Sequence, residues 1–118
     1  MSDGGLTMAV EWERTLDDLL DRTSKFPKSM RYVLGARIDD AAIDVAVLLV
    51  DARFTKTERR RRTLEELNLR LNRLRVLVRL AHQRRCLDHG AFEHVVRGLD
   101  AFGRGLGAWL KQAAGSAA

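Results

Sequence analysis

The segment that decides the fold covers residues 55–87 and reads TKTERRRRTLEELNLRLNRLRVLVRLAHQRRCL. Its main apolar residues recur at alternating intervals of three and four, the spacing of one face of a helix that packs lengthwise against other helices. These residues are Leu64, Leu67, Leu71, Leu74, Val78 and Ala81. The segment therefore predicts one long helix over residues 57–86, with this face in a helical core.

The same segment holds the positive charge of the chain. It contains eleven basic and three acidic residues, a net charge of +8, whereas the whole chain of 118 residues has a net charge of +5. Residues 1–26 carry a net charge of −3, and the remainder is balanced. A basic surplus confined to one helix favours a surface that faces a polyanion. The alternative is a solvated face whose arginines partly pair with acidic residues of the first helix, residues 8–22, of a neighbouring molecule.

Arginine suits a phosphate partner because its guanidinium group can donate two parallel hydrogen bonds to phosphate oxygens. We expect the arginines of this helix to contact a nucleic-acid backbone without reading its sequence. Few aromatic residues lie among them, so base stacking is not the expected mode of binding. The candidate nucleic-acid-binding residues are Arg59, Arg62, Arg70, Arg73, Arg75, Arg79, Arg84 and Arg85.

A second apolar strip on this helix predicts an oligomer. At 100° per residue, Leu69, Val76 and Leu80 lie roughly opposite the core face, where a monomer would leave them in water. Three residues add a similar apolar surface to the preceding segment: Ile43, Val47 and Val50. We therefore predict a homo-oligomer, with Leu69, Val76 and Leu80 in the subunit interface.

Three more stretches have the periodicity of amphipathic helices whose apolar stripes would face the same core. They cover residues 8–22, 27–53 and 89–111. The connections are short, so consecutive helices should pack antiparallel. We expect an all-α fold in which residues 1–118 form a single domain, an up-down antiparallel four-helix bundle that assembles into a ring-like homo-oligomer. Residues 1–7 and 113–118 are expected to be disordered.

Local signals mark where these helices begin. Pro27 suits a first helical turn, and Phe26 before it is expected to plug the end of the core. Thr55 and Glu58 fit the capping-box pattern, in which the two side chains bind backbone N–H groups at a helix start. Asp88 suits the N-cap of the last helix. Four glycines in that helix are expected to let another backbone approach closely. They are Gly98, Gly103, Gly105 and Gly107.

Several classes of protein are disfavoured by what the sequence contains. The single cysteine, Cys86, cannot form an intramolecular disulfide, which favours a reducing cytoplasm. No apolar run reaches the roughly 18 residues of a membrane span. His82, His89 and His94 lack the spacing of zinc or di-iron ligands. We expect a cytoplasmic protein that is not an enzyme and has no metal, cofactor or membrane partner.

Five short stretches carry a resemblance to a known family. They are FPK at residues 26–28, RYVLGARI at 31–38, LEELN at 64–68, LRVLVRLA at 74–81 and GLGAWLK at 105–111. From Trp12 onward the chain resembles the four-helix-bundle proteins that include the ribosomal-RNA intervening-sequence proteins. Within that group it is most similar to the accessory variability determinants of diversity-generating retroelements. Ala108 departs from the family pattern, in which glycine is common at this position.

The resemblance implies a four-helix protomer, a five-membered ring with a basic surface, and binding both to nucleic acid and to the retroelement's reverse transcriptase. It implies a non-catalytic role in mutagenic reverse transcription and retrohoming, the copying of a template repeat into a variable gene. Arg75 and Arg79 are the basic surface positions that the resemblance carries over, and the other arginines rest on charge geometry alone.

Two alternatives stay open at this point. One is a structural interaction protein of the intervening-sequence type, whose basic face would meet an acidic protein without direct binding to nucleic acid. The other is a small bundle enzyme or metal carrier, which stoichiometric metal in the purified protein would support.

Overall fold

The computed structural model describes residues 3–117 and the side chains of residues 4–115. Four long helices make up the bundle: α1 (Asp3–Thr23), α3 (Ala36–Phe54), α4 (Thr57–Gln83) and α5 (His89–Ala117). A single turn of helix, α2 (Lys28–Met30), and a π-helical turn, η1 (Arg31–Gly35), lead into α3. Residues 3–117 contain no strand. The predicted all-α four-helix bundle is confirmed.

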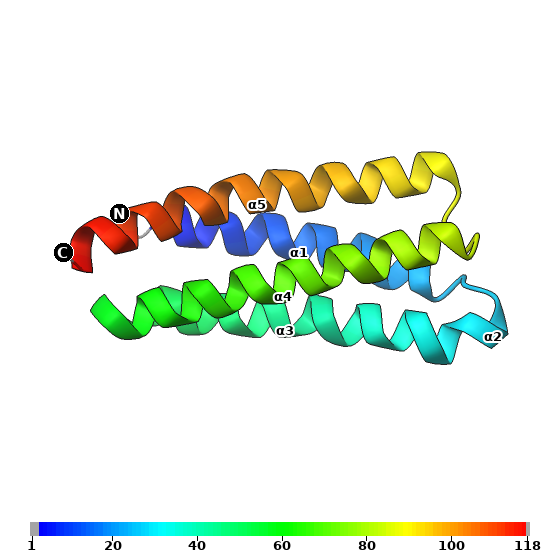
Figure 1. Cartoon of the computed structure of the whole chain (residues 1–118), viewed down its shortest axis with the longest axis horizontal. Helices are drawn as coiled ribbons and strands as arrows, with labels where there is room; N and C mark the ends of the chain where they lie inside the picture. Colours follow the sequence, from blue (N-terminus) through cyan, green and yellow to red (C-terminus); the bar gives the residue numbers. More distant parts are fainter. Residues whose placement is uncertain (1–2, 118) are drawn as a thin grey trace.

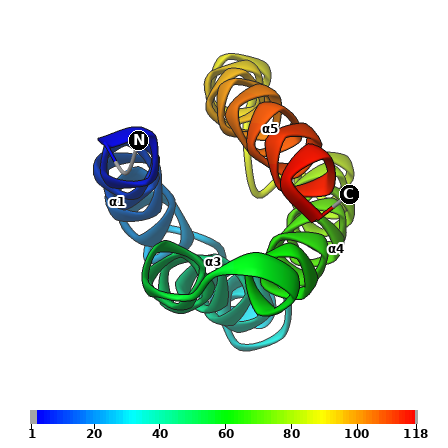
Figure 2. The same cartoon turned by 90° about the vertical axis from the view of Figure 1, so that its left-hand side faces the viewer.

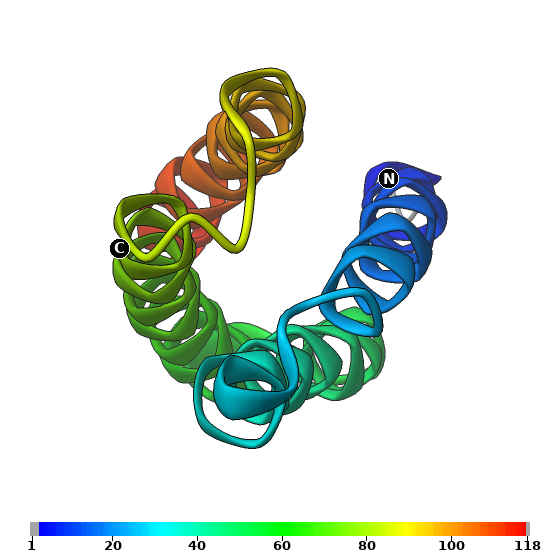
Figure 3. The same ribbon diagram turned by 90° about the vertical axis from the view of Figure 1, so that its right-hand side faces the viewer.

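The four long helices follow one another around an arc (Figure 1, Figure 2). α1 and α5 lie at the two ends of this arc, and α3 and α4 lie between them (Figure 3). Each helix runs antiparallel to the one before it, so α1 and α4 run in the same direction (Figure 1). The bundle measures 47 × 22 × 20 Å along its principal axes.

The predicted face of α4 lies at the centre of the core. Each of its six residues is at most 1% exposed. Opposite this face, the indole N–H of Trp12 in α1 donates a hydrogen bond to the carbonyl oxygen of Ala42 in α3 at 2.9 Å. The indole ring also lies 4.6 Å from the ring of Phe102 in α5, measured between centroids. Trp12 therefore joins three helices, and Phe26 closes one end of the core as predicted.

The second predicted helix, residues 27–53, is interrupted by the π-helical turn η1. One extra residue in this turn changes which side chains face inward. Leu34 and Gly35 are buried, whereas Tyr32 is 73% exposed. A Cβ atom on Gly35 would lie 3.6 Å from the Phe26 ring, so glycine here lets the helix pack closely on the buried plug. The spacing of apolar residues in the sequence does not predict this local change in helical winding.

Both ends of the chain extend further as helix than predicted. α1 begins at Asp3 rather than residue 8, and α5 continues to Ala117 rather than ending at residue 111. The added part of α1 packs closely on α3 and α5, because a Cβ atom on Gly5 would lie 3.0 Å from the Arg53 side chain and 3.1 Å from the Trp109 side chain. Residues 3–7 and 113–117 are therefore helical, whereas residues 1, 2 and 118 lie outside the described residues.

The capping box predicted at the start of α4 is wrong. The Thr55 hydroxyl donates to the carbonyl oxygen of Asp51 at 2.8 Å, which closes the end of α3 instead. Glu58 pairs with Arg61 rather than reaching back along the chain. Lys56 occupies the N-cap position and makes no side-chain capping bond. At α5 the prediction is confirmed, because Asp88 Oδ1 accepts a hydrogen bond from the Ala91 N–H at 2.8 Å.

α4 ends at Gln83, three residues before the predicted end. The backbone N–H of Arg85 donates to the His82 carbonyl at 3.0 Å, and that of Cys86 donates to the Ala81 carbonyl at 2.8 Å. This pair of bonds defines a Schellman motif, which needs a left-handed residue after the helix. Arg85 takes that conformation, with φ of 63°. Glycine is the usual residue there, so the sequence gives no signal of the helix end.

Candidate nucleic-acid interface

The buried face of α4 determines where its arginines lie. Because the core residues point into the bundle, the strip formed by Leu69, Val76 and Leu80 points outward, with exposed fractions of 46%, 45% and 39%. The helical spacing places Arg73 on the same face as this strip and Arg79 to one side of it. The outer surface of α4 is therefore an apolar strip bordered by arginines. That the strip is exposed is confirmed, and its part in a subunit interface stays a prediction.

Four of the eight candidate arginines are exposed and have no carboxylate partner among residues 4–115. They are Arg73, Arg79, Arg84 and Arg85. Arg84 and Arg85 lie in the turn that follows α4, so their position depends on the Schellman motif described above. A guanidinium group without an internal partner keeps all its donors for an incoming anion.

Arg59 and Arg62 lie in the first turns of α4 and are only loosely paired. Arg59 Nη2 lies 3.3 Å from Asp51 Oδ1, and Arg62 Nη1 lies 3.9 Å from Glu58 Oε2. Both arginine side chains are mainly exposed to solvent. Exposed ion pairs of this kind contribute about 0–1 kcal/mol, so a phosphate group can replace the carboxylate at little cost.

Arg75 is held within the molecule. Its Nη1 donates to Asp100 Oδ1 at 2.6 Å and its Nη2 donates to the Leu99 carbonyl oxygen at 3.3 Å, so it joins α4 to α5. A Cβ atom on Gly103 would lie 2.8 Å from Arg75 Nη2. The guanidinium group therefore occupies the space left by a missing side chain. The structure assigns Arg75 to helix packing rather than to the free basic surface.

Arg70 is also engaged internally, on the other side of α4. Its Nε donates to Glu66 Oε2 at 2.7 Å and its Nη1 donates to Asp44 Oδ2 of α3 at 3.2 Å. The hydrogen bond to Glu66 raises the pKa of Arg70 above its ordinary value. The sequence shows the Glu66 pairing, which is four residues away, but gives no sign of the contact with Asp44.

Arg60 and Arg61, which follow one another near the start of α4, also bind groups of the same chain. Arg60 Nε donates to the Ala52 carbonyl oxygen at 2.9 Å and its Nη2 donates to the Arg53 carbonyl oxygen at 3.0 Å, which satisfies the last turn of α3. Arg61 binds both Glu58 and Glu65. The hydrogen bond from Arg61 lowers the pKa of Glu58.

The glycines of α5 make room for side chains, whereas the sequence predicted close approach of another backbone. Besides Gly103 beside Arg75, a Cβ atom on Gly98 would lie 3.3 Å from the Thr15 hydroxyl oxygen. Gly105 faces the Met8 side chain, and Gly107 has nothing within 4 Å. Gly98, Gly103 and Gly105 thus leave room for side chains of α1 and α4 that pack against α5.

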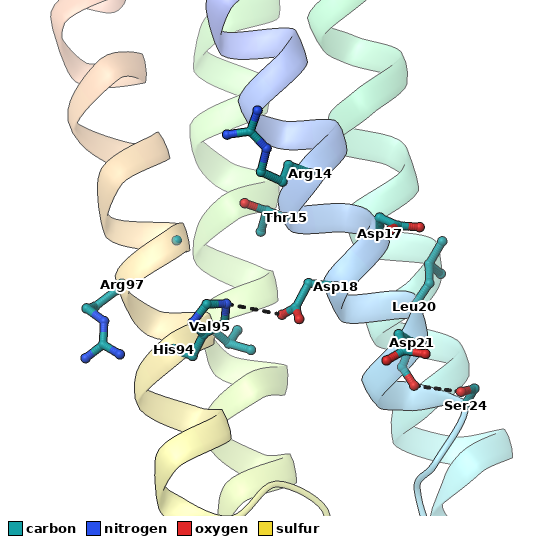
Figure 4. A pocket seen from close by; sticks show the side chains of 11 residues that line it. Arg14, Thr15, Asp17, Asp18, Leu20, Asp21, Ser24, His94, Val95 and Arg97 are labelled. Atoms are coloured by element: carbon teal, nitrogen blue, oxygen red, sulfur yellow. Dashed lines mark hydrogen bonds and ion pairs between the residues drawn. The ribbon is translucent and has the colours of Figure 1, made fainter.

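A polar groove of about 870 Å³ separates α1 from α5 near one end of the bundle (Figure 4). Asp17, Asp18 and Asp21 line it from α1. The only side-chain contact drawn across it joins His94 Nε2 to Asp18 Oδ2 at 3.9 Å (Figure 4). Arg14 and Arg97 line the same groove, so its lining carries both acidic and basic side chains.

Among the described residues, no three His, Cys, Asp or Glu side chains gather closely enough to hold a metal ion. None of the helices in residues 3–117 combines the length and apolar character needed to cross a membrane.

The structure thus defines a small all-helical bundle with an arginine-bordered outer surface on one helix. The chain belongs to the bAvd-like family, whose model matches residues 8–113. This match confirms the resemblance to the accessory variability determinants, and the wider grouping with ribosomal-RNA intervening-sequence proteins stays a prediction. No curated protein matches the chain.

Proposed function

We propose that this protein is a non-enzymatic accessory protein of a diversity-generating retroelement. It binds nucleic acid through α4, associates with the reverse transcriptase, and supports mutagenic reverse transcription and retrohoming in the cytoplasm. Membership of the bAvd-like family supports this role. The observation that carries the nucleic-acid part is the set of exposed arginines on α4 and in the turn after it that lack strong internal partners.

These arginines extend along the whole helix, from Arg59 near its start to Arg84 at its end. At 1.5 Å per residue the two are about 38 Å apart, and phosphates follow one another every 3.4 Å along one strand of a duplex. Several phosphates can therefore be contacted at once. Binding is expected to be salt-sensitive and tolerant of sequence, with RNA, DNA or their hybrid as the ligand.

In this proposal the protein acts as a ring-like homo-oligomer, with five subunits as the family resemblance implies. The exposed strip of Leu69, Val76 and Leu80 supports association, because an apolar strip of this kind is commonly covered by a partner. A ring also multiplies the number of basic surfaces, and binding at several of them at once raises the apparent affinity.

The direct test titrates the purified protein against a labelled RNA–DNA hybrid at low salt. We expect the wild-type protein to bind, and an Arg62→Ala/Arg84→Ala variant to bind about tenfold more weakly. The matched control is Arg14→Ala/Arg104→Ala, two exposed arginines of α1 and α5 that have no ion-pair partner among residues 4–115. Equal losses in both variants would point to net charge alone, and no binding by the wild type would overturn the proposal.

Association with the reverse transcriptase needs a separate measurement. We expect the enzyme of the same retroelement to co-purify with this protein after nuclease treatment, which removes nucleic acid that could bridge the two. Loss of the complex on nuclease treatment would contradict direct contact between the proteins.

A further inference from the structure

Two of the three histidines of the chain lie at the junction of α4 and α5. His82 is in the last turn of α4 and His89 begins α5, and their ring centroids are 6.0 Å apart. The backbone N–H of Arg85 donates to the His82 carbonyl oxygen at 3.0 Å, so the Schellman motif keeps Arg84 and Arg85 at the same end of the helix as the two rings. Figure 3 looks onto the end of the bundle that carries this junction.

The ring of His82 is held in place by stacking. It lies on the ring of Phe92 in α5, with centroids 4.1 Å apart and planes inclined by 10°. Among residues 4–115 no side chain or backbone group hydrogen-bonds to its nitrogen atoms, and neither nitrogen is buried. A protonated imidazole donates from both nitrogens, so a charged His82 would offer two donors to an anion.

His89 is the more open of the two histidines. Its side chain is 75% exposed, and its Nε2 lies 3.2 Å from Glu93 Oε2, one turn further along α5. This contact holds the ring through one nitrogen and leaves Nδ1 without a partner among residues 4–115. His89 can therefore meet an external anion without losing its contact with Glu93.

The charge of the junction depends on these two rings. In residues 82–93, Arg84 and Arg85 are balanced by Asp88 and Glu93, so the segment has no net charge when its histidines are neutral. It has a net charge of +2 when both are protonated. The end of the arginine-rich helix thus attracts a polyanion strongly only after its histidines take up protons.

The other charged and titratable groups around the junction do not cancel this change. Arg79, one turn before His82 in α4, adds positive charge. Burial raises the pKa of the Cys86 thiol, which stays neutral. On the side of α1, the carboxylates that line a groove of about 350 Å³ beside the turn already have partners: Asp18 pairs with Arg22 at 2.9 Å and Asp21 with Lys25 at 3.3 Å.

We propose that His82 and His89 are phosphate-binding residues of the nucleic-acid interface, and that they take up protons when phosphate contacts them. Two imidazolium groups 6.0 Å apart repel each other, and an anion bound beside both offsets this repulsion. Each protonated ring also donates a charge-assisted hydrogen bond to a phosphate oxygen. This role rests on the proposed binding of nucleic acid by α4, and it adds two histidines to the arginines there.

The proposed contact makes binding depend on pH in a defined direction. Histidine side chains in general gain their second proton near about pH 6.5. Because the protonated form binds phosphate better, affinity should rise as the pH falls through neutrality. By linkage, nucleic acid should in turn draw protons onto the protein when it binds near neutral pH.

The first test measures affinity for a labelled RNA–DNA hybrid at fixed ionic strength, at about pH 8 and about pH 6. We expect the wild type to gain about tenfold on acidification, or about threefold for each imidazolium, as for exposed ion pairs. The variant His82→Phe/His89→Gln keeps a ring on Phe92 but cannot take up these protons. It should gain less than about twofold, and near pH 8 it should bind within about threefold of wild type.

Two further variants serve as controls. His94→Gln removes the third histidine, which lies 3.9 Å from Asp18 on the side of α5 that faces α1, and it should keep the tenfold gain. His89→Gln alone changes only a mainly exposed side chain, and it should keep about a threefold gain even if phenylalanine disturbs the other position. Circular dichroism at both pH values should show wild-type helix content in every variant.

The second test counts protons directly. Isothermal titration calorimetry in buffers of different ionisation enthalpy measures the protons taken up when the hybrid binds near neutral pH. We expect the wild type to take up as much as about one proton per binding site, and His82→Phe/His89→Gln to take up almost none.

Three outcomes would overturn the role of the two histidines and leave phosphate binding by the arginines intact. They are equal wild-type affinity at both pH values, a double variant that keeps the wild-type gain or proton uptake, and a His94→Gln variant that loses as much of the gain as the double variant. Failure of the wild type to bind the hybrid at either pH would overturn both this role and the proposed function.

Discussion

Arg75 and Asp100 form an ion pair at 2.6 Å that ties α4 to α5, across a position where Gly103 leaves room for the guanidinium group. The pair lies 25 residues apart in sequence. It turns a residue that the family resemblance marks as basic surface into a part of the helix packing. The structure therefore separates arginines that hold the bundle together from arginines that remain available to a partner.

Replacing Arg75 by alanine should lower stability more than it lowers nucleic-acid affinity. The variant loses an ion pair and a hydrogen bond to the Leu99 carbonyl, both partly exposed, so we expect a loss of about 0.5–1.5 kcal/mol in the free energy of unfolding. Urea denaturation measures this loss. Affinity for an RNA–DNA hybrid should change less than about threefold; a tenfold loss in a fully folded variant would return Arg75 to the binding surface.

Two glycines of α5 should respond differently to the same change. Gly107→Ala gains helix propensity and meets nothing within 4 Å, so we expect it to stabilise the protein by up to about 1 kcal/mol. Gly103→Ala gains the same propensity but displaces the Arg75 guanidinium group, so its net effect should be smaller or unfavourable. Thermal unfolding of both variants checks this order, and equal stabilisation would argue against the packing described for Arg75.

Much of this fold follows from the sequence because it depends on local periodicity. The spacing of the apolar residues from Leu64 to Ala81 predicts the whole core face of α4. The residue type of Asp88 predicts the N-cap of α5. The π-helical turn at Arg31–Gly35 packs on Phe26, and the first residues of α1 pack on Arg53 and Trp109. Such contacts join distant segments, so no local pattern contains them.

The candidate nucleic-acid interface can likewise be predicted from the sequence only in part. The sequence predicts both the clustering of arginines on α4 and the exposure of the strip formed by Leu69, Val76 and Leu80. Which arginines are free depends on acids of other helices, such as Asp44 and Asp100, and on glycines opposite them. The sequence therefore predicts the basic helix, but it does not show that Arg70 and Arg75 make contacts with other helices of the bundle.

Arg85 occupies a position where glycine is the preferred residue, because its φ is 63°. Arg85→Gly should therefore stabilise the protein by about 1 kcal/mol, the cost of the left-handed conformation for a residue with a side chain. Arg84→Gly, at a φ of −87°, is the matched control and should give no such gain. If Arg85 also contacts phosphate, the more stable variant will bind nucleic acid more weakly. Destabilisation by Arg85→Gly in urea denaturation would contradict the Schellman motif.

Leu71 and Leu69 differ in exposure on the same helix, at 1% and 46%. Leu71→Ala opens a cavity in the core and should cost about 2–5 kcal/mol in the free energy of unfolding. Leu69→Ala should cost less than about 0.5 kcal/mol at protein concentrations where the wild type is monomeric. At higher concentrations Leu69→Ala should weaken assembly, whereas a variant that assembles as wild type does would remove Leu69 from the interface.

The most direct test of the account is the salt dependence of binding to an RNA–DNA hybrid. The logarithm of the association constant should fall linearly as the logarithm of salt concentration rises, with a slope that reports the number of phosphates neutralised. We predict a steep slope for the wild type and a shallower one for Arg62→Ala/Arg84→Ala, by about 0.7–0.9 for each lost contact. A wild-type slope near zero, or an identical slope in the variant, would contradict phosphate binding by the arginines of α4.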